Sequence, residues 1–179
     1  MMTETSKQHK EQAPKKLSFA IYICSTSRYH QMEKNKNISD TSGDIIQNLI
    51  QTSEHDVLHK KIILDDKAMI VKTFEECLAT ADLDVAIFSG GTGIASADVT
   101  IEAISPLLEK TLPGFGEFFR RLSFDEVGMA ALLSRAIAGV AGGKAFFCIP
   151  GSPNAVKIAV EKLILPEVSH IIKHVREQQ

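Results

Sequence analysis

Four short apolar segments divide this chain, and each of them ends in small or polar residues. They span residues 17–24, 57–64, 85–88 and 145–149. Their length and their content of Ile, Val and Phe are typical of β-strands. Three of them are expected to be buried, whereas the lysines of residues 57–64 predict a strand near an edge of the sheet. Stretches with helical periodicity separate them, so strand and helix alternate along the chain. This alternation predicts an α/β fold of three layers (α/β/α), in which helices cover both faces of a mostly parallel central sheet.

The first helices can be placed from apolar spacing and from residues that cap helix ends. One helix is expected from Thr41, which together with Asp44 resembles a capping box. A second helix opens at Asp65-Asp66 and buries a stripe of apolar residues at helical intervals. That stripe consists of Ile70, Phe74, Cys77, Leu78 and Ala81. The polar stretch 25–40 is expected to be a long loop.

Turn and helix signals follow each other in the last third of the chain. Residues Pro113 to Gly116 predict a turn, and Gly139 is expected to end a helix. Ser152 can cap a helix N-terminus with Pro153 at the first helical position. We expect four helices in this part, over residues 117–122, 129–138, 154–164 and 167–176.

Length and composition restrict the protein to a few classes. With 179 residues, of which 44% are hydrophobic and 23% charged, the chain resembles an ordinary globular domain. Residues 1–15 are polar and lack periodicity, so we expect a disordered tail, with residues 16–179 forming a single domain. No apolar run is long enough to span a membrane, and a net charge of −2 argues against nucleic-acid binding.

The cysteines and histidines give weaker signals. Cys24, Cys77 and Cys148 lie far apart within apolar runs and are predicted to be reduced, buried thiols. Because the N-terminus lacks the apolar core of a secretion signal, we expect a cytoplasmic protein. His170 and His174 stand four residues apart, a spacing that is common by chance, and are expected at the surface of the last helix.

The segments that follow the four predicted strands should gather at one edge of the sheet, because parallel strands share their carboxyl ends there. They are Ser25–Arg28, Asp65-Asp66, Gly90–Gly93 with Asp98 shortly after, and Pro150–Pro153. Glycine amides and helix N-termini bind phosphate oxygens, and carboxylates in such a site suit Mg²⁺. The residues alone therefore indicate an α/β phosphate-binding protein with a nucleotide or phosphoester site.

Each of these features also has a purely structural explanation. Asp65 or Asp66 can simply cap the helix that follows, and capping can coexist with a role in the site. The glycine turn can be only a tight corner, since it lacks the Lys of a Walker A loop and the third glycine of a dinucleotide fingerprint. Ser152-Pro153 is fully explained as a helix start.

Six motifs along the chain point to a more specific interpretation. They are DTSGD (40–44), LDD (64–66), FSGGTGIASADVT (88–100), LPGFGE (112–117), LSRA (133–136) and IPGSP (149–153). In sequence and in order they resemble the motifs of the MoaB/MogA family of molybdenum cofactor biosynthesis proteins. The resemblance covers residues 17–176, and the compact C-terminus is more similar to MoaB than to MogA.

This resemblance implies a fold, an activity and a set of site residues. It implies the three-layer fold, a homo-oligomer (a trimer or hexamer) and a Mg²⁺-dependent reaction of ATP with molybdopterin that gives adenylylated molybdopterin and pyrophosphate. Other proteins of the same pathway are possible partners. Asp65 and Asp98 match the family's two functional aspartates, which implies that they are catalytic and hold Mg²⁺.

The remaining site residues implied by the resemblance fall into two groups. Molybdopterin or its phosphate would contact Ser25, Ser27, Asp40, Ser42, Gly43, Gly90, Gly91, Thr92, Gly93, Ser134 and Arg135. The nucleotide would contact Asp66, Ser89, Gly151, Ser152 and Pro153.

Two positions depart from the family pattern and leave alternatives open. Ser27 stands where an Asp is common, and Asn154 stands where a Lys is common, so each position lacks a charge. An alternative function is therefore a non-catalytic paralogue that carries molybdopterin or scaffolds the pathway. A third possibility is a different phosphoester enzyme on the same fold, such as a hydrolase.

Overall fold

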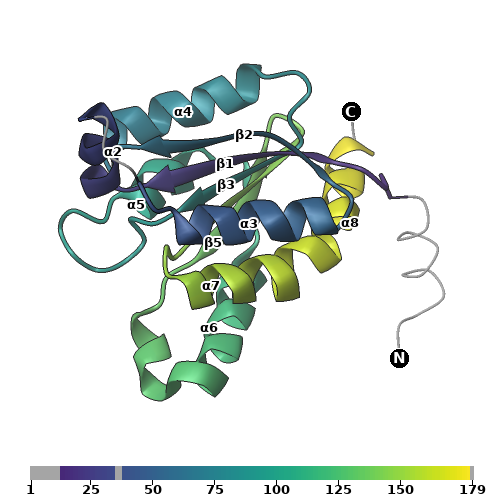
Figure 1. Ribbon diagram of the computed structural model, residues 1–179. Helices are drawn as coiled ribbons and strands as arrows, with labels where there is room; N and C mark the ends of the chain where they lie inside the picture. The colour runs from purple at the N-terminus through teal and green to yellow at the C-terminus, as the bar shows by residue number, and fades with distance from the viewer. Residues whose placement is uncertain (1–12, 35–37, 178–179) are drawn as a thin grey trace.

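A six-stranded sheet forms the centre of the protein (Figure 1). The structure is a computed structural model and describes residues 13–34 and 38–177. The strands, in their order across the sheet, are β2 (Asp56–Ile63), β1 (Ser18–Cys24), β3 (Val85–Ser89), β6 (Lys144–Ile149), β5 (Ile137–Ala141) and β4 (Lys110–Thr111). The first four are parallel to one another, whereas β5 and β4 are antiparallel to their neighbours. The mostly parallel sheet and the edge position of the second predicted strand are thus confirmed.

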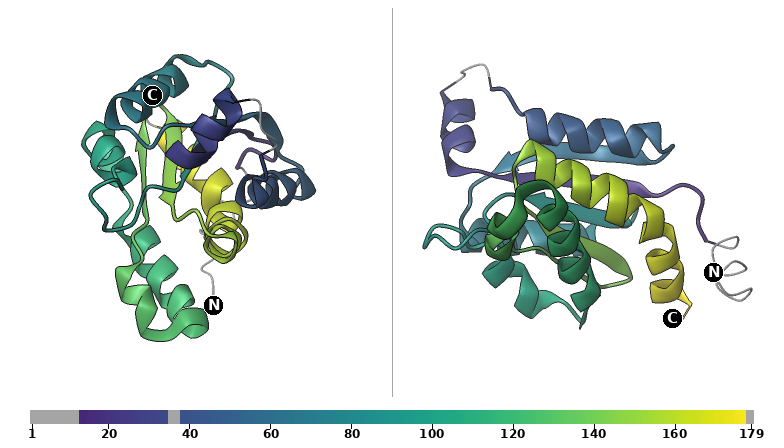
Figure 2. Two further views of the ribbon diagram at one scale, coloured as in Figure 1. Left: turned by 60° about the vertical axis from the view of Figure 1, so that its left-hand side comes forward. Right: turned by 90° about the horizontal axis from the view of Figure 1, so that it is seen from below.

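Helices cover both faces of this sheet, which gives the predicted three layers (Figures 1 and 2). One face carries α3 (Thr41–Thr52), α6 (Pro113–Val127), α7 (Pro153–Lys157), the π-helical segment η3 (Ile158–Ile164) and α8 (Leu165–Arg176). The other face carries α4 (Lys67–Ala79) and α5 (Thr100–Ile104), followed by η1 (Ser105–Leu107). Side chains of β1 alternate between the two cores, as the period of a strand requires: Ile21 faces the first and Tyr22 the second.

The sequence prediction missed two strands, β4 and β5. Residues 129–138 are not a helix: the short 3₁₀ segment η2 (Gly128–Leu133) is followed by β5. The segment IAGVA has too little bulk to show a strand pattern, and Gly139 is needed for pairing and not for ending a helix. A Cβ at Gly139 would lie 2.5 Å from the carbonyl oxygen of Lys110 in β4.

Several helix boundaries also differ from the prediction. The stretch after β1 is not all loop, because α2 (Thr26–Glu33) forms there with Ser25 as its N-cap. Helix α3 is capped by Asp40, whose side chain accepts from the Gly43 amide, and not by a Thr41 capping box.

Two prolines and part of the apolar stripe of α4 also differ from the prediction. Pro113 starts α6 instead of a turn, since proline is accommodated in the first helical turn. All residues from Pro153 to Arg176 are helical, but the π-helical segment η3 ends at Ile164, and Pro166 lies in the first turn of a separate helix, α8. In the predicted stripe of α4, Leu78 is exposed and Ala81 lies beyond the helix.

The cysteine prediction is confirmed: Cys24, Cys77 and Cys148 are free and buried. Burial raises the pKa of the Cys24 thiol to about 12, which keeps it protonated and unreactive. Within the described ranges, no helix combines the length and the apolar character that a membrane crossing requires. Of the predicted tail, residues 1–12 lie outside the described residues.

Candidate active site

The loops that leave four parallel strands begin at the same level of the sheet. Cys24 at the end of β1 is level with Ile63 at the end of β2, and Ser89 of β3 is level with Ile149 of β6. The amide of Gly90 donates to the carbonyl of Ile149 (3.0 Å), which continues this alignment into the loops. The four predicted segments therefore do meet at one edge, which we call the carboxyl rim.

The glycine turn is shaped by groups that lie directly against its backbone. Gly90 and Gly91 have φ values of 105° and 61°, which favour glycine. A Cβ at Gly90 would lie 2.4 Å from the carbonyl oxygen of Cys24, and a Cβ at Gly91 would lie 2.3 Å from Oδ1 of Asp65. At Gly93 it would lie 2.6 Å from Oδ2 of Asp98. Only glycine leaves room for these two carboxylates.

The structure thus brings Asp65 and Asp98 together beside the glycine turn. Asp98 accepts a hydrogen bond from the Ala95 amide (2.9 Å), which fixes its carboxylate. Burial raises the pKa of Asp65, hydrogen bonding by the Val99 backbone opposes this rise, and the nearby negative charge of Asp98 adds to it. Oδ1 of Asp65 is buried and has no hydrogen-bond partner among the described residues. A buried carboxylate oxygen without a hydrogen-bond partner can bind a cation or accept a hydrogen bond from a ligand.

This pair of carboxylates fits a Mg²⁺ ion. Mg²⁺ is commonly held by one or two carboxylates and completes its shell with water and substrate phosphate oxygens. In the described part of the chain, no group of three or more His, Cys, Asp or Glu side chains could hold a metal ion. A site of two aspartates is therefore the kind that depends on a phosphate-bearing substrate to complete it.

Side chains hold the carbonyl groups of the two rim loops in place. The hydroxyl of Thr100 donates to the carbonyl of Gly90 (2.9 Å), and that of Ser42 donates to the carbonyl of Gly151 (2.8 Å). Ser89 donates to the carbonyl of Pro150 (3.4 Å). In a trans peptide the next amide N–H points away from the carbonyl, so fixing the carbonyl also fixes a hydrogen-bond donor. The two loops are thereby preorganised.

Thr100 was missed by the sequence prediction, although it ends the glycine motif. Glu102 in α5 was also missed, and it explains the position of Arg135. The Arg135 guanidinium pairs with both carboxylate oxygens of Glu102 (2.6 and 3.3 Å), and its Nε donates to the carbonyl of Thr92 (2.9 Å). Arg135 therefore holds the glycine loop through its hydrogen bond to Thr92, and it also lines the pocket beside that loop.

Other predicted residues have clear structural tasks. Asp66 caps α4 by accepting from the Met69 amide, and Ser152 caps α7 with Pro153 in its first turn. Both caps agree with the structural explanation given by the sequence. Ser25 caps α2 and lies 3.3 Å, oxygen to oxygen, from the exposed Ser27 hydroxyl.

The cap of α3 leaves a further acceptor near the rim. Asp40 lies against Gly43, where a Cβ would come within 2.0 Å of its Oδ2. That oxygen is buried and has no hydrogen-bond partner among the described residues, although Lys60 lies 3.8 Å away. Asp40 and Gly43 therefore belong to one rigid helix start, which positions Ser42 beneath Gly151.

A pocket of about 260 Å³ opens at the carboxyl rim. It is bounded by the glycine loop, by the segment after η2 and by the loop after β6. Its lining residues are Gly91, Thr92, Gly93, Asp98, Leu133, Ser134, Arg135, Pro150 and Gly151. Seven of these nine are among the predicted site residues. The pocket joins parts of the chain that are up to 60 positions apart, so the rim is a convergent site.

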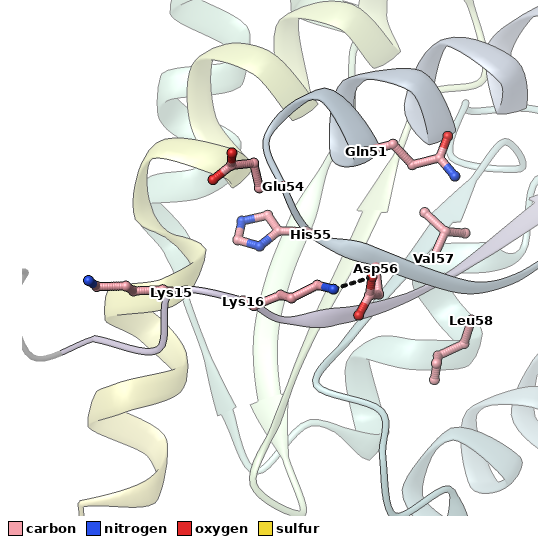
Figure 3. Close-up of a pocket in the computed structure, with 8 residues that line it drawn as sticks. All are labelled: Lys15, Lys16, Gln51, Glu54, His55, Asp56, Val57 and Leu58. Carbon is pink, nitrogen blue, oxygen red and sulfur yellow. Dashed lines mark ion pairs between the residues drawn. The ribbon is translucent and has the colours of Figure 1, made fainter.

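A larger pocket of about 890 Å³ lies near the opposite end of the sheet, at the start of β2 (Figure 3). None of the predicted site residues lines it. Its Lys16 and Asp56 are paired with each other (2.8 Å) and both side chains are more than half exposed. We place the candidate site at the smaller rim pocket, because it is lined by the half-buried Asp98 and by the fixed glycine loop, with Asp65 directly behind Gly91.

The chain is similar to known proteins over most of its length. Residues 20–170 match the family model described as a probable molybdopterin binding domain. The chain belongs to the MoaB/MogA family. It is 41% identical over 169 residues to molybdenum cofactor biosynthesis protein B of Halalkalibacterium halodurans, covering 94% of this chain and 95% of that protein. It is also 40% identical to a probable molybdopterin adenylyltransferase of Methanocaldococcus jannaschii, covering 91% and 96%.

Solved structures of MoaB proteins share the fold. A crystal structure of a molybdenum cofactor biosynthesis protein B matches with a TM-score of 0.82 and 40% identity, covering 94% of this chain and all of that one. The tungsten cofactor synthesizing protein MoaB of Pyrococcus furiosus matches with a TM-score of 0.79 and 38% identity, covering 92% and 99%.

The six MoaB/MogA motifs can be located in this structure. Most lie at the carboxyl rim, but LPGFGE forms the start of α6. There Gly116 packs so closely against the LSRA segment that a Cβ would lie 2.6 Å from the carbonyl oxygen of Ala136. In this family member the LPGFGE motif therefore fixes the segment that carries Ser134 and Arg135.

Proposed function

We propose that this protein transfers AMP from ATP to molybdopterin, giving adenylylated molybdopterin and pyrophosphate. One observation carries the proposal: Asp65 and Asp98 converge on a glycine turn at the carboxyl rim of a parallel sheet. A relative that is 40% identical is named a probable molybdopterin adenylyltransferase. Glycine amides and paired carboxylates are the groups that a phosphoryl or nucleotidyl transfer requires.

The proposed reaction needs positioning more than acid–base catalysis. An oxygen of the terminal phosphate of molybdopterin forms a bond to the α-phosphorus of ATP, and the bond between that phosphorus and the bridging oxygen breaks to release pyrophosphate. The attacking phosphate is already an anion, so no histidine or activated serine is needed. Amides of residues 90–93 hold phosphate oxygens, and the fixed loop 150–153 orients the second substrate. Bound at Asp65 and Asp98, Mg²⁺ would neutralise triphosphate charge.

The direct test is to incubate the protein with molybdopterin and Mg-ATP and to measure the adenylylated product. Asp65→Asn and Asp98→Asn are each expected to lower turnover at least about 100-fold, as for loss of a charge-stabilising group. Asp82→Asn is the matched control, because Asp82 is exposed and lies just before β3 at the other end of the sheet. Wild-type turnover in both rim variants would reject the metal-site assignment.

One observation favours a second function, that of a molybdopterin carrier without transferase activity. Arg135, the one cation among the predicted site residues, is already paired with Glu102. Asn154, at the position where the family often has Lys, donates to Glu126. A carrier would bind molybdopterin but not ATP, whereas the enzyme would bind both. Calorimetric titration with each substrate separates the two functions.

The proposed active form is a homo-oligomer. Six large apolar side chains of α6 and η2 are at least half exposed in the single chain, and this part projects from the body of the molecule (Figure 1). They are Phe118, Phe124, Val127, Met129, Leu132 and Leu133. Such a concentration on one projecting segment supports a subunit contact. Light scattering should give the mass of three or six chains for wild type and a smaller mass for Leu132→Asp.

A further inference from the structure

Helix α8 carries two histidines whose rings face each other, far along the chain from the glycine turn. The Nε2 atoms of His170 and His174 are 2.8 Å apart, and the ring centroids are separated by 4.5 Å. The residues stand four positions apart, so their side chains share one face of the helix. Nδ1 of His170 lies 3.4 Å from Glu167, and Nδ1 of His174 lies 3.2 Å from Glu177.

The positions of the ring protons decide what this contact is. A carboxylate can only accept, so an Nδ1 that hydrogen-bonds to a glutamate carries a proton. With both Nδ1 atoms protonated, the two neutral rings direct the lone pairs of their Nε2 atoms at each other across 2.8 Å, which is repulsive, whereas a ring with its proton on Nε2 would donate to the other. A cation between the two nitrogens, either a shared proton or a metal ion, removes the repulsion. Glu167 offsets its positive charge, and Glu177 does so in part, because Glu177 also pairs with Lys173 (3.3 Å).

We infer that His170 and His174 form a binding site for a first-row divalent transition metal ion such as Zn²⁺. Imidazole nitrogen is a favoured ligand of these ions. A carboxylate that accepts from the other ring nitrogen orients a histidine ligand and increases its basicity. Two Zn–N bonds of about 2.0–2.1 Å at a tetrahedral angle place the nitrogens roughly 3.3 Å apart. A small rotation of the rings therefore makes room for the ion.

The surroundings of the pair indicate an open, exchangeable site. Because the described residues contain no group of three or more potential metal ligands, the other coordination positions fall to water or to an external ligand. His174 also lines a pocket of about 380 Å³, together with Lys110, Ile171 and Val175. This pocket leaves space beside the ring. Such a site binds its ion independently of the aspartates at the carboxyl rim.

The test is calorimetric titration of the untagged, full-length protein with ZnCl₂ in Mg²⁺-free buffer. We expect one Zn²⁺ per chain at this site. His170→Gln and His174→Gln should each weaken binding at least about 10-fold, and the double variant should lose it. Glu167→Gln should weaken it by about 10-fold, the effect typical of an outer-shell partner. The matched control is His30→Gln, because His30 in α2 is an exposed histidine paired with a glutamate, Glu33, at 3.0 Å.

A second measurement separates this site from any other zinc site. Zn²⁺ should raise the thermal unfolding midpoint of wild type, His30→Gln and Asp65→Asn, but not that of the double histidine variant. Unchanged Zn²⁺ binding in the double variant would overturn the inference, since the ion would then bind elsewhere. Absence of wild-type binding at millimolar Zn²⁺ would overturn it as well.

Discussion

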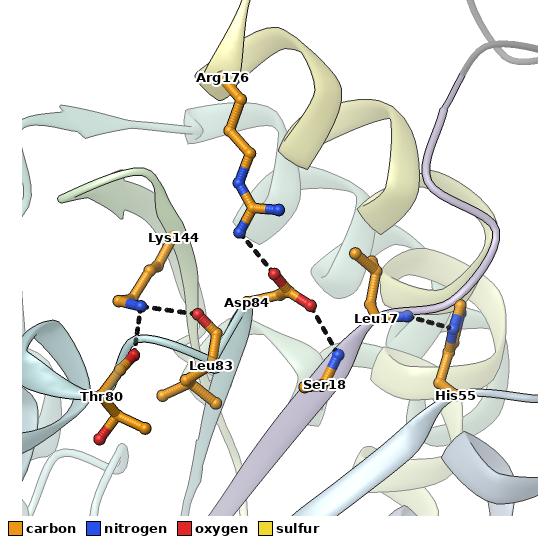
Figure 4. Close-up of polar contacts among 8 residues, drawn as sticks. All are labelled: Leu17, Ser18, His55, Thr80, Leu83, Asp84, Lys144 and Arg176. Carbon is orange, nitrogen blue, oxygen red and sulfur yellow. Dashed lines mark hydrogen bonds and ion pairs between the residues drawn. The ribbon is translucent and has the colours of Figure 1, made fainter. Parts of the chain in front are cut away.

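The two ends of the central sheet treat buried charge in opposite ways. At the end where β6 begins, Lys144 is 6% exposed and donates to two backbone carbonyls, those of Thr80 (2.6 Å) and Leu83 (2.7 Å) (Figure 4). At the carboxyl rim, Asp65 has a buried oxygen without a hydrogen-bond partner among the described residues. At the first end the charged group is satisfied within the protein, whereas at the second end one carboxylate oxygen is left for a ligand.

Asp84 makes the comparison sharper, because it is the same residue type as Asp65. One oxygen of Asp84 accepts from the Ser18 amide (2.7 Å), and the other pairs with Arg176 of α8 (Figure 4). These contacts join β3, β1 and the C-terminal helix. The difference teaches that buried charge stabilises this fold at one end of the strands and is available for chemistry at the other.

The largest expected effect comes from the same substitution at the two ends. Asp84→Asn should lower the unfolding midpoint, because it weakens a charged network, and should leave turnover nearly unchanged. Asp65→Asn should lower turnover at least about 100-fold and leave the midpoint equal or higher, because it removes a buried charge. Thermal unfolding and product assays on both variants measure these opposite effects on the unfolding midpoint and on turnover. A loss of stability in Asp65→Asn equal to that in Asp84→Asn would break the comparison.

The next effect concerns stability alone. Lys144→Met retains most of the side-chain volume but leaves the carbonyls of Thr80 and Leu83 without their donor. The cost should be about 2 kcal/mol, which is typical of unsatisfied buried polar groups. For a chain of this size that lowers the unfolding midpoint by roughly 4–8 °C. Lys72→Met is the control, since Lys72 is 72% exposed and should change the midpoint little. Equal midpoints for the two variants would contradict this assignment.

A smaller effect tests the preorganised loops. Thr100→Val removes the hydroxyl that holds the Gly90 carbonyl and keeps the side-chain shape. We expect turnover to fall by about 3- to 10-fold, the equivalent of one hydrogen bond. Thr73→Val removes an equivalent hydroxyl-to-carbonyl bond within α4, to Met69 (2.8 Å), and should leave turnover unchanged. If both variants have the same turnover, the Thr100 contact is not needed to orient the loop.

The smallest effect is a pH dependence. Burial raises the pKa of Asp65 above its ordinary value of 3.8, so the folded state binds this proton more tightly than the unfolded state. Ionised Asp65 therefore destabilises the fold above its raised pKa, and that cost is relieved as the pH falls toward 3.8. The difference in unfolding midpoint between Asp65→Asn and wild type should be greatest near pH 7 and shrink on acidification. A difference that grows on acidification would show the opposite pKa shift.

The sequence predicted the parallel part of this fold well, because three of its strands are nearly continuous apolar runs and each of the four is followed by small or polar residues or by proline. It failed at β4 and β5, where the strands are short and one contains Gly139, so that pairing with neighbours outweighs local pattern. The motif residues of the candidate site were recognisable because they follow the strands directly. Glu102 could not be found, because its importance depends on a contact with Arg135, 33 positions away.

The base of the candidate site, formed by the backbone of Cys24, Gly90 and Gly151, limits where the site can vary. Three loops meet there with main chain packed against main chain: Gly90 lies against the Cys24 carbonyl, and a Cβ at Gly151 would approach the Cα of Gly90 to 3.2 Å. At these closely packed positions there is little room for any side chain. Substitutions that change the shape of the pocket are therefore expected at its walls, at Leu133, Ser134 and Arg135, and not at its base.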